Sequence, residues 1–212
     1  MTEKYVPFSA AEYARRLSKT RAAMERAGLD AMFVTDPSNQ AWLTGYDGWS
    51  FYVHQGVIVT HDRDPIWWGR YMDSIGALRT CWMASASVHG YADNYVQSTV
   101  RHPMQDLAGH IRALGLATAR IGVEMENYYY SAKAHAVLAD ELPDATLVDA
   151  TALVNWQRLI KSDEEIAFIR NAAKISDKVV TTAIERAEPG LRKNDLVADI
   201  FHAAISGVGD LW

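Results

Sequence analysis

Apolar side chains at helical spacing mark the first element of the chain. They precede Gly28, a common helix stop, and comprise Tyr13, Leu17 and Met24. Ser9 with Glu12 three residues later has the pattern of a capping box, in which each side chain bonds the backbone N–H of the other residue. The pattern predicts an amphipathic helix between Ser9 and Gly28.

Short apolar runs alternate with helical patterns over the following residues. Strands are predicted at 30–35, 56–60, 65–69, 87–91, 120–124 and 145–148, and helices at 37–43, 72–82, 103–111, 131–142 and 149–160. The strands at 56–60 and 65–69 flank a polar turn and should pair as a hairpin, with Trp67 and Trp68 on opposite faces. This alternation predicts an α/β fold with a mixed, mostly parallel sheet flanked by helices.

A second capping box, Ser162 with Glu165, begins a long helical pattern that ends at Pro189-Gly190. A further helix is predicted at 194–205. We place a domain boundary at this junction, with one domain at 1–160 and the start of another at 161–212. Two helices cannot bury their apolar stripes by themselves, so we expect these residues to continue into a longer protein or to need a partner.

An aromatic loop is predicted at 45–55, with the sequence GYDGWSFYVHQ. Trp49, Phe51 and Tyr52 supply apolar faces and His54 a polar tip, a combination typical of the wall of a small-ligand pocket. The alternative is a buried hairpin strand whose successive side chains lie on opposite faces of a sheet. Taken alone, these residues favour the alternative, because aromatic side chains more often serve a core than a ligand.

A second aromatic cluster, Asn127–Tyr130, follows the predicted strand at 120–124. Ligand contacts are common beyond the end of such a strand in an open α/β sheet, but a docking surface for another domain or subunit fits equally well. Glu124 and Glu126 lie at the same strand end. They could act as an acid/base pair, but a hydrogen-bonded structural role is favoured at this position.

Composition excludes several classes of function. The 212 residues are 49% hydrophobic and carry a formal net charge of -5, with dispersed basic residues, which argues against a nucleic-acid partner. The densest basic group shares its predicted helix with Glu12 and Glu25 and should form a solvated face: Arg15, Arg16, Lys19 and Arg21. No apolar run approaches the length of a membrane span, and the first residues lack a signal-peptide pattern, so we expect a cytoplasmic location and no membrane partner.

The familiar catalytic motifs are missing from the sequence. Cys81 is the single cysteine, which excludes an intramolecular disulfide, and beside Trp82 it is predicted to be a small core residue. Three widely spaced histidines lack carboxylates in a metal-ligand pattern and are expected to be structural or exposed: His89, His102 and His110. We therefore expect no cofactor and no metal ligand among these residues, and no catalytic group can be named.

Several passages resemble the creatinase, prolidase and aminopeptidase P superfamily. They are Asp36–Asn39 with Leu43–Tyr46, and above all the junction Ile160–Ile166. In that superfamily a smaller N-terminal α/β domain precedes a catalytic domain of the pita-bread fold. Other passages are similar to the branch that hydrolyses ectoine: the aromatic loop, Tyr95–Ser98, Arg101–Met104, Asn127–Ser131, Asp149–Thr151 and Val154–Trp156.

The resemblance implies hydrolytic opening of the cyclic amidine of ectoine to N-acetyl-diaminobutyrate by a cytoplasmic homodimer. In the creatinase branch, the N-terminal domain of one subunit reaches the active site of the other. By this resemblance the candidate substrate-binding residues are Trp49, Phe51, Tyr52 and His54, whose aromatic faces suit a planar cation. The catalytic residues are expected beyond Trp212, so the chain alone should be inactive.

Two alternatives remain open at this point. The chain could belong to another enzyme of the superfamily, such as a creatinase, an Xaa-Pro peptidase or a metal-dependent lyase of small solutes. It could instead be a dimerisation or ligand-sensing module without catalytic activity.

Overall fold

The computed structural model describes residues 4–211, which form two compact units with the boundary between Leu159 and Ile160. The helices of the first unit are α1 (Ala10–Arg26), α2 (Pro37–Thr44), α3 (Tyr71–Thr80), α4 (Pro103–Ala113), α5 (Ala132–Glu141) and α6 (Leu153–Arg158). Its strands are β1 (Ala31–Val34), β2 (Gly56–Thr60), β3 (Ile66–Arg70), β4 (Val88–Tyr91), β5 (Arg120–Val123) and β6 (Thr146–Asp149). The second unit contains α7 (Asp163–Arg186) and α8 (Lys193–Ser206).

The six strands form one mixed sheet in the order β4-β3-β2-β1-β5-β6. The pairs β1–β2 and β2–β3 are antiparallel, whereas β3–β4, β1–β5 and β5–β6 are parallel. The predicted hairpin is therefore confirmed, with Val57 opposite Trp67. The mixed, mostly parallel sheet is confirmed as well.

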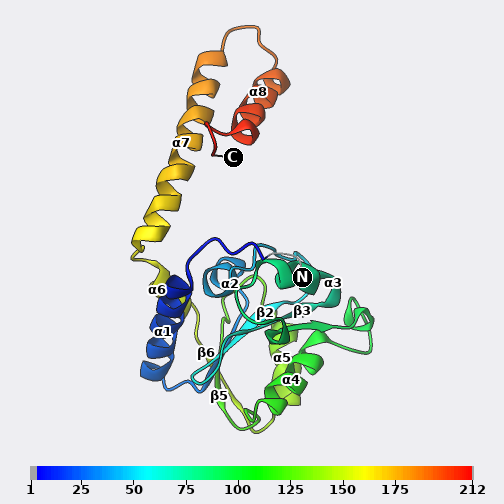
Figure 1. Ribbon diagram of the computed structural model, residues 1–212. Coiled ribbons are helices and arrows are strands. Elements are labelled where there is room, and N and C mark those ends of the chain that lie inside the picture. Colours follow the sequence, from blue (N-terminus) through cyan, green and yellow to red (C-terminus); the bar gives the residue numbers. More distant parts are fainter. Residues whose placement is uncertain (1–3, 212) are drawn as a thin grey trace. The chain divides into compact units, whose positions relative to one another are not determined.

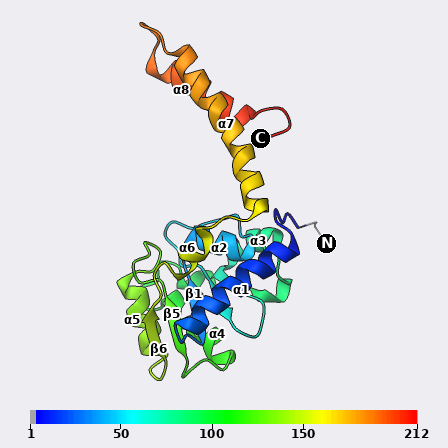
Figure 2. The ribbon, with the colours of Figure 1, turned by 90° about the vertical axis from the view of Figure 1, so that its left-hand side faces the viewer.

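Side chains that alternate along the strands build two cores on the two faces of the sheet. On one face Met32, Val59 and Trp67 pack with residues of α1, α2, α3 and α6. On the other face Phe33 and Trp68 pack with residues of α4 and α5. The first unit is thus a three-layer α/β sandwich (Figures 1 and 2), and the two adjacent tryptophans lie on opposite faces, as predicted.

Cys81 is fully buried in the first of these cores, and burial raises the pKa of its thiol to about 12. Its predicted role as a small core residue is confirmed. The predicted helix at 149–160 is shorter than expected, because α6 spans only Leu153–Arg158. Ala152 precedes it in a left-handed conformation with φ 61°, which ends any regular structure continuing from β6.

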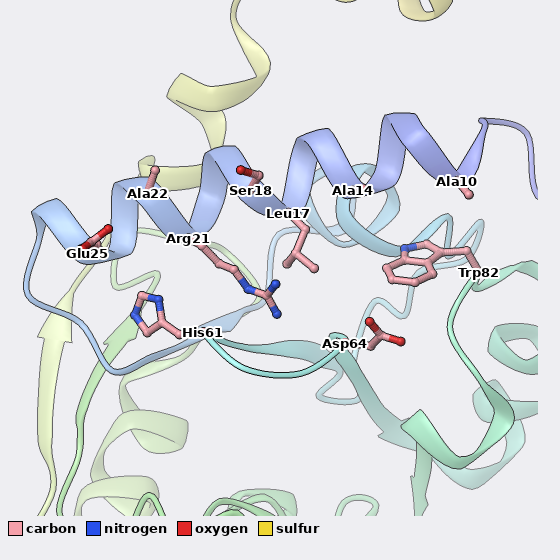
Figure 3. Close-up of a pocket in the computed structure, with 10 residues that line it drawn as sticks. All are labelled: Ala10, Ala14, Leu17, Ser18, Arg21, Ala22, Glu25, His61, Asp64 and Trp82. Atoms are coloured by element: carbon pink, nitrogen blue, oxygen red, sulfur yellow. The ribbon is translucent and has the colours of Figure 1, made fainter.

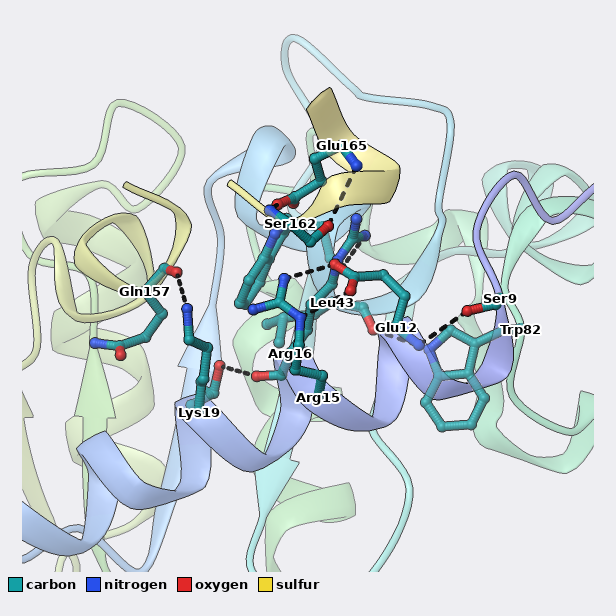
Figure 4. A network of polar contacts seen from close by, with 12 residues as sticks. Ser9, Glu12, Arg15, Arg16, Lys19, Leu43, Trp82, Gln157, Ser162 and Glu165 are labelled. Carbon is teal, nitrogen blue, oxygen red and sulfur yellow. Dashed lines mark hydrogen bonds and ion pairs between the residues drawn. The ribbon is translucent and has the colours of Figure 1, made fainter. Parts of the chain in front are cut away.

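The solvated basic face predicted for α1 is wrong at Arg16, whose side chain is only 1% exposed. Arg16 Nε donates to Glu12 Oε1 over 2.8 Å (Figure 4). Its Nη1 donates to the carbonyl oxygen of Trp42 over 3.0 Å. Its guanidinium also lies 3.9 Å from the ring centroid of Phe8. Burial of this charge is possible because Glu12, one helical turn earlier and itself 4% exposed, neutralises it.

At the start of α1, Ser9 Oγ accepts the N–H of Glu12, so the predicted N-cap is confirmed. Lys19 further along the helix donates to the carbonyl oxygen of Gln157 over 3.3 Å (Figure 4). This contact joins α1 to α6, which also pack against each other.

In the second unit, Ser162 and Glu165 form both hydrogen bonds of the predicted capping box. Helix α7 packs against α8, and Arg186 Nε lies 2.7 Å from Asp199 Oδ2. Ile184 and Phe201 remain 71% and 61% exposed, so part of the apolar stripes of this unit is uncovered. Within residues 4–211, no helix combines the length and apolar composition that crossing a bilayer requires.

The buried ion pair on α1 yields a test of stability. Glu12→Gln leaves a buried guanidinium without its counter-charge, and we expect the free energy of unfolding to fall by about 3 kcal/mol. Urea unfolding followed by tryptophan fluorescence measures the change. Glu25→Gln alters an exposed carboxylate on the same helix and serves as the control. Equal effects of the two substitutions would contradict a structural role for the buried pair.

Candidate functional site

The aromatic loop at 45–55 is irregular and contains no strand. The buried-hairpin alternative is therefore wrong, because Trp49, Phe51 and Tyr52 are 59%, 66% and 59% exposed. Gly45 begins the loop with φ 81°, and a Cβ there would lie 2.7 Å from Tyr13 Oη, so only glycine fits without strain. Three of the four side chains predicted to face a ligand are therefore exposed, whereas His54 is half-buried.

The aromatic loop meets the second aromatic cluster in space. The Trp49 ring stands edge to face with Phe51 and with Tyr129, at centroid distances of 6.2 and 6.1 Å, and Tyr129 in turn lies 5.6 Å from Tyr128. We call these four residues the aromatic surface. Tyr130 is not part of it, because its ring is buried in the core beside α5. The sequence predicted two clusters but not their contact.

His54 lies with His102, outside the aromatic surface. The two imidazole centroids are 4.9 Å apart. Both rings line a cavity of about 160 Å³ between the aromatic loop and the segment that leads into α4, here called the imidazole cavity. Tyr52 also lines this cavity. Two of the four candidate substrate-binding residues, Tyr52 and His54, therefore lie here. Sequence reasoning treated His102 as structural and did not pair it with His54.

Burial keeps both imidazoles neutral. Burial lowers the pKa of His54, and this effect outweighs a hydrogen bond with the backbone of Tyr129, which raises the same pKa. Burial also lowers the pKa of His102 to about 4, with His54 and Lys133 adding like-charge repulsion. His102 also caps α4, because its Nδ1 accepts the N–H of Met104 over 3.2 Å. The proton of its neutral ring therefore lies on Nε2.

Another crevice, of about 210 Å³, lies at the carboxyl ends of β1, β5 and β6. We call it the acidic crevice. Asp36 and Glu126 contribute carboxylates, and Tyr128 and Tyr129 of the aromatic surface form part of its wall. Ligands of open α/β sheets commonly bind at this end of parallel strands.

Glu124, at the base of the acidic crevice, is 2% exposed and holds the strand ends together. Its Oε2 accepts the N–H groups of Thr35 and Asp36 over 2.6 and 2.7 Å, and its Oε1 accepts Asn39 Nδ2 over 2.7 Å. Burial raises the pKa of its carboxyl, and these hydrogen bonds lower it. The favoured structural role of Glu124 is confirmed by these contacts. Glu126 is exposed, and the two do not share a buried acid/base arrangement.

Asn39 extends this network to α6. Its Nδ2 also donates to Asn155 Oδ1 over 2.8 Å, and its Oδ1 accepts Arg158 Nη1 over 2.7 Å. The start of α2, the end of β5 and helix α6 are thereby held in one arrangement.

Backbone strain coincides with both cavities. Gln97 (φ 51°) and Ala152 (φ 61°) are the two non-glycine residues with positive φ in the described chain, and they line the imidazole cavity and the acidic crevice respectively. Such conformations cost energy and gather at functional sites.

A larger groove, of about 550 Å³, lies between α1 and the turn joining β2 to β3 (Figure 3). Arg21 projects into it, but its guanidinium donates to the carbonyl oxygens of Thr60 and Arg63. His61 is bound in the same way, through Nε2 and the carbonyl oxygen of Leu29 at 2.8 Å. The basic groups of this groove are thus bound to backbone carbonyl oxygens, and none of the predicted site residues lines the groove.

Within residues 4–211, no group of three or more His, Cys, Asp or Glu side chains could hold a metal ion. The rings of His89 and His110 lie 4.6 Å apart, on β4 and α4. Asp106 beside them accepts Trp68 Nε1 over 2.7 Å, so this group supports the core.

Comparison with known proteins places this fold in a family. The model of the creatinase/prolidase N-terminal domain matches residues 16–160, and the chain belongs to that family. Ectoine hydrolase of Halomonas elongata is 49% identical over 208 residues, which are 98% of this chain and 52% of that protein. Creatinase of a Bacillus species is 28% identical, over 89% of this chain and 44% of its own length.

Solved structures agree on the fold. An Xaa-Pro dipeptidase from Bacillus anthracis superposes with a TM-score of 0.71 at 16% identity, over 92% of this chain and 49% of that one. The chain thus spans about half the length of the relatives it matches.

The Glu124 network yields a second stability test. Glu124→Gln places an amide N–H₂ where five donors now converge, so at least one buried donor loses its acceptor, at a cost of about 2 kcal/mol. Chemical unfolding measures the loss. Glu126→Gln, two residues later and exposed, is the matched control and should be nearly neutral. A neutral Glu124→Gln would show that the carboxylate is not needed at the strand ends.

The depressed pKa of His102 predicts a pH dependence. Unfolded histidine titrates near a pKa of about 6.5, so between that value and the folded value of about 4 the unfolded state binds more protons. The contribution of His102 to the free energy of unfolding is therefore fully present above pH ~6.5 and is lost as the pH drops toward ~4. His102→Asn keeps an N-cap acceptor and should flatten this loss, measured by urea midpoints across the range. His202→Asn, at an exposed position on α8, should leave the profile unchanged.

Proposed function

We propose that this chain is the N-terminal part of a hydrolase that opens the cyclic amidine of ectoine to N-acetyl-diaminobutyrate. The observation that supports this most directly is the 49% identity with ectoine hydrolase, which extends over 98% of the chain and so includes the aromatic loop. An exposed aromatic surface next to a carboxylate-lined crevice suits a planar cation, through cation–π contact and charge attraction.

In this proposal Trp49, Phe51 and Tyr52 offer faces to the amidine ring. His54 is neutral near pH 7 because burial lowers its pKa, so a ring nitrogen can accept a hydrogen bond from an amidinium N–H. These residues bind and orient the substrate. The base that activates water and the groups that stabilise the tetrahedral intermediate belong to the catalytic half of the full-length protein.

The same proposal assigns residues 161–212 to the beginning of a pita-bread catalytic domain and makes the working enzyme a cytoplasmic homodimer. The aromatic surface of one subunit would complete the active site of the other, and the 212-residue chain alone would be inactive. The uncovered apolar side chains of α7 and α8 support a continuing domain, because such stripes are buried in stable folds.

A chimera tests the function. This chain replaces the matching first half of the Halomonas elongata ectoine hydrolase, and ectoine hydrolysis is followed by chromatography of the product. We expect turnover by the chimera and none by the 212-residue chain. Turnover by the chain alone would contradict the division of roles. Cleavage of Xaa-Pro peptides or creatine in place of ectoine would instead favour another enzyme of the superfamily.

Within the chimera, Trp49→Ala should raise the KM for ectoine by about tenfold, the ratio expected for loss of one good cation–π contact. Trp156→Ala is the control, because Trp156 is 68% exposed on α6 and outside the aromatic surface. If both variants keep the parent KM, the aromatic surface does not contact the substrate.

A further inference from the structure

The imidazole cavity differs in charge from the acidic crevice. Its lining includes hydrogen-bonding groups from two segments and no Asp or Glu: Tyr52, His54, Tyr95, Gln97, Arg101 and His102. The acidic crevice, by contrast, is lined by three carboxylate residues and no Lys or Arg. The two cavities are therefore suited to ligand groups of opposite charge.

The positive charges at the imidazole cavity are not neutralised by the protein. Arg101 lines the cavity with an exposed side chain, and Lys133 is close enough to lower the pKa of His102. Among the ion pairs of residues 4–211, none involves Arg101 or Lys133. Arg70 shows the contrast, since its Nε is 2.7 Å from the carboxylate of Asp93.

A neutral donor stands beside these charges. The Nδ1 atom of His102 is occupied by the N–H of Met104, so Nε2 carries the ring proton. No hydrogen bond within residues 4–211 uses that Nε2–H. Helix α4 begins at Pro103, which also lines the cavity, and its N-terminal end adds a partial positive charge. Gln97, with its positive φ, lines the same cavity.

The cavity is connected to the aromatic surface through two residues. Tyr52 comes from the aromatic loop, and the His54 ring is hydrogen-bonded to the backbone of Tyr129, whose own ring belongs to the aromatic surface. A ligand group in the cavity would thus lie next to the residues proposed to bind the amidine.

We propose that the imidazole cavity is a carboxylate-binding site in which Arg101 supplies the charge and His102 a hydrogen bond. This inference rests on the proposed function for the identity of the ligand, since ectoine carries a carboxylate on the same ring as its cationic amidine. The carboxylate enters the imidazole cavity at Arg101 and His102, and the amidine lies against the aromatic surface. His54, which contacts both His102 and the backbone of Tyr129, faces the amidine at the edge of the cavity. A volume of about 160 Å³ accommodates a carboxylate with several waters.

The first experiment tests the cavity alone, using acetate as the probe. The His102 ring resonances of the 212-residue chain are followed by NMR during acetate titration. We expect saturable shifts of these resonances. The affinity for acetate should be about tenfold weaker in Arg101→Gln, because that variant loses one charge-assisted hydrogen bond. Arg120→Gln, an exposed position at the start of β5, is the matched control and should behave like the parent chain. Absent His102 shifts, or equal affinities in Arg101→Gln and the parent, overturn the proposal.

The second experiment tests the ligand assignment in the chimera described above. Ectoine is compared with the same methylated tetrahydropyrimidine ring lacking its carboxylate, used as a competitive inhibitor. We expect Arg101→Gln to raise the KM for ectoine about tenfold and to leave the inhibition constant of the decarboxylated ring unchanged. Equal weakening of both, or no change in either, overturns the assignment. Loss of ectoine hydrolysis in the parent chimera would instead count against the proposed function, and the acetate result would stand separately.

Discussion

The arrangement of the first unit depends on one buried carboxylate. Parallel strands β1 and β5 end side by side, and the chain leaving β1 turns into α2 with backbone N–H groups that need acceptors. Glu124 accepts the N–H groups of Thr35 and Asp36, and through Asn39 it reaches α6. The aromatic loop follows α2, and the second aromatic cluster follows Glu124 itself. Their meeting at Trp49 and Tyr129 is therefore set by the hydrogen bonds of this carboxylate.

Charge separates the two sides of the candidate site. Glu126 and Asp36 make the crevice at the strand ends acidic, whereas the cavity beside His102 has a guanidinium at its wall and two imidazoles kept neutral by burial. A neutral imidazole is the appropriate form next to an unpaired guanidinium, because a protonated ring would repel it. The aromatic surface between them is uncharged and offers area for a ring. This distribution suits a solute that carries a cationic and an anionic group better than a solute with a single charge.

Periodicity was sufficient to predict most of the fold. The alternation of Trp67 and Trp68, the capping residues Ser9 and Ser162 and the hairpin turn are local signals, and each appears in the structure as expected. Arg16 was misassigned because charge was given more weight than position. It lies on the same helical face as the buried Tyr13 and Thr20, which was a readable signal for burial.

The candidate site was only partly predictable. The composition of the aromatic loop indicated a ligand wall, but its irregular backbone depends on Gly45 packing against Tyr13, a contact between residues far apart in sequence. The pairing of His54 with His102 and the contact of Trp49 with Tyr129 are long-range as well. No local pattern encodes such neighbours, so the cavity beside α4 could be found only in the folded structure.

The packing of α1 on α6 has a consequence for synthesis of the chain. Helix α1 leaves the ribosome before α6, but Lys19 bonds to Gln157 and Asn39 to Arg158, more than a hundred residues later in each case. At roughly 5–20 residues per second, the first helix remains without these partners for about 7–30 s of translation. Leu17 and Met24 of α1 have earlier partners in the same core, such as Met32 and Trp42, so the contacts with α6 are the last to form. The first unit therefore reaches its full set of hydrogen bonds only after the last turn of α6 has emerged.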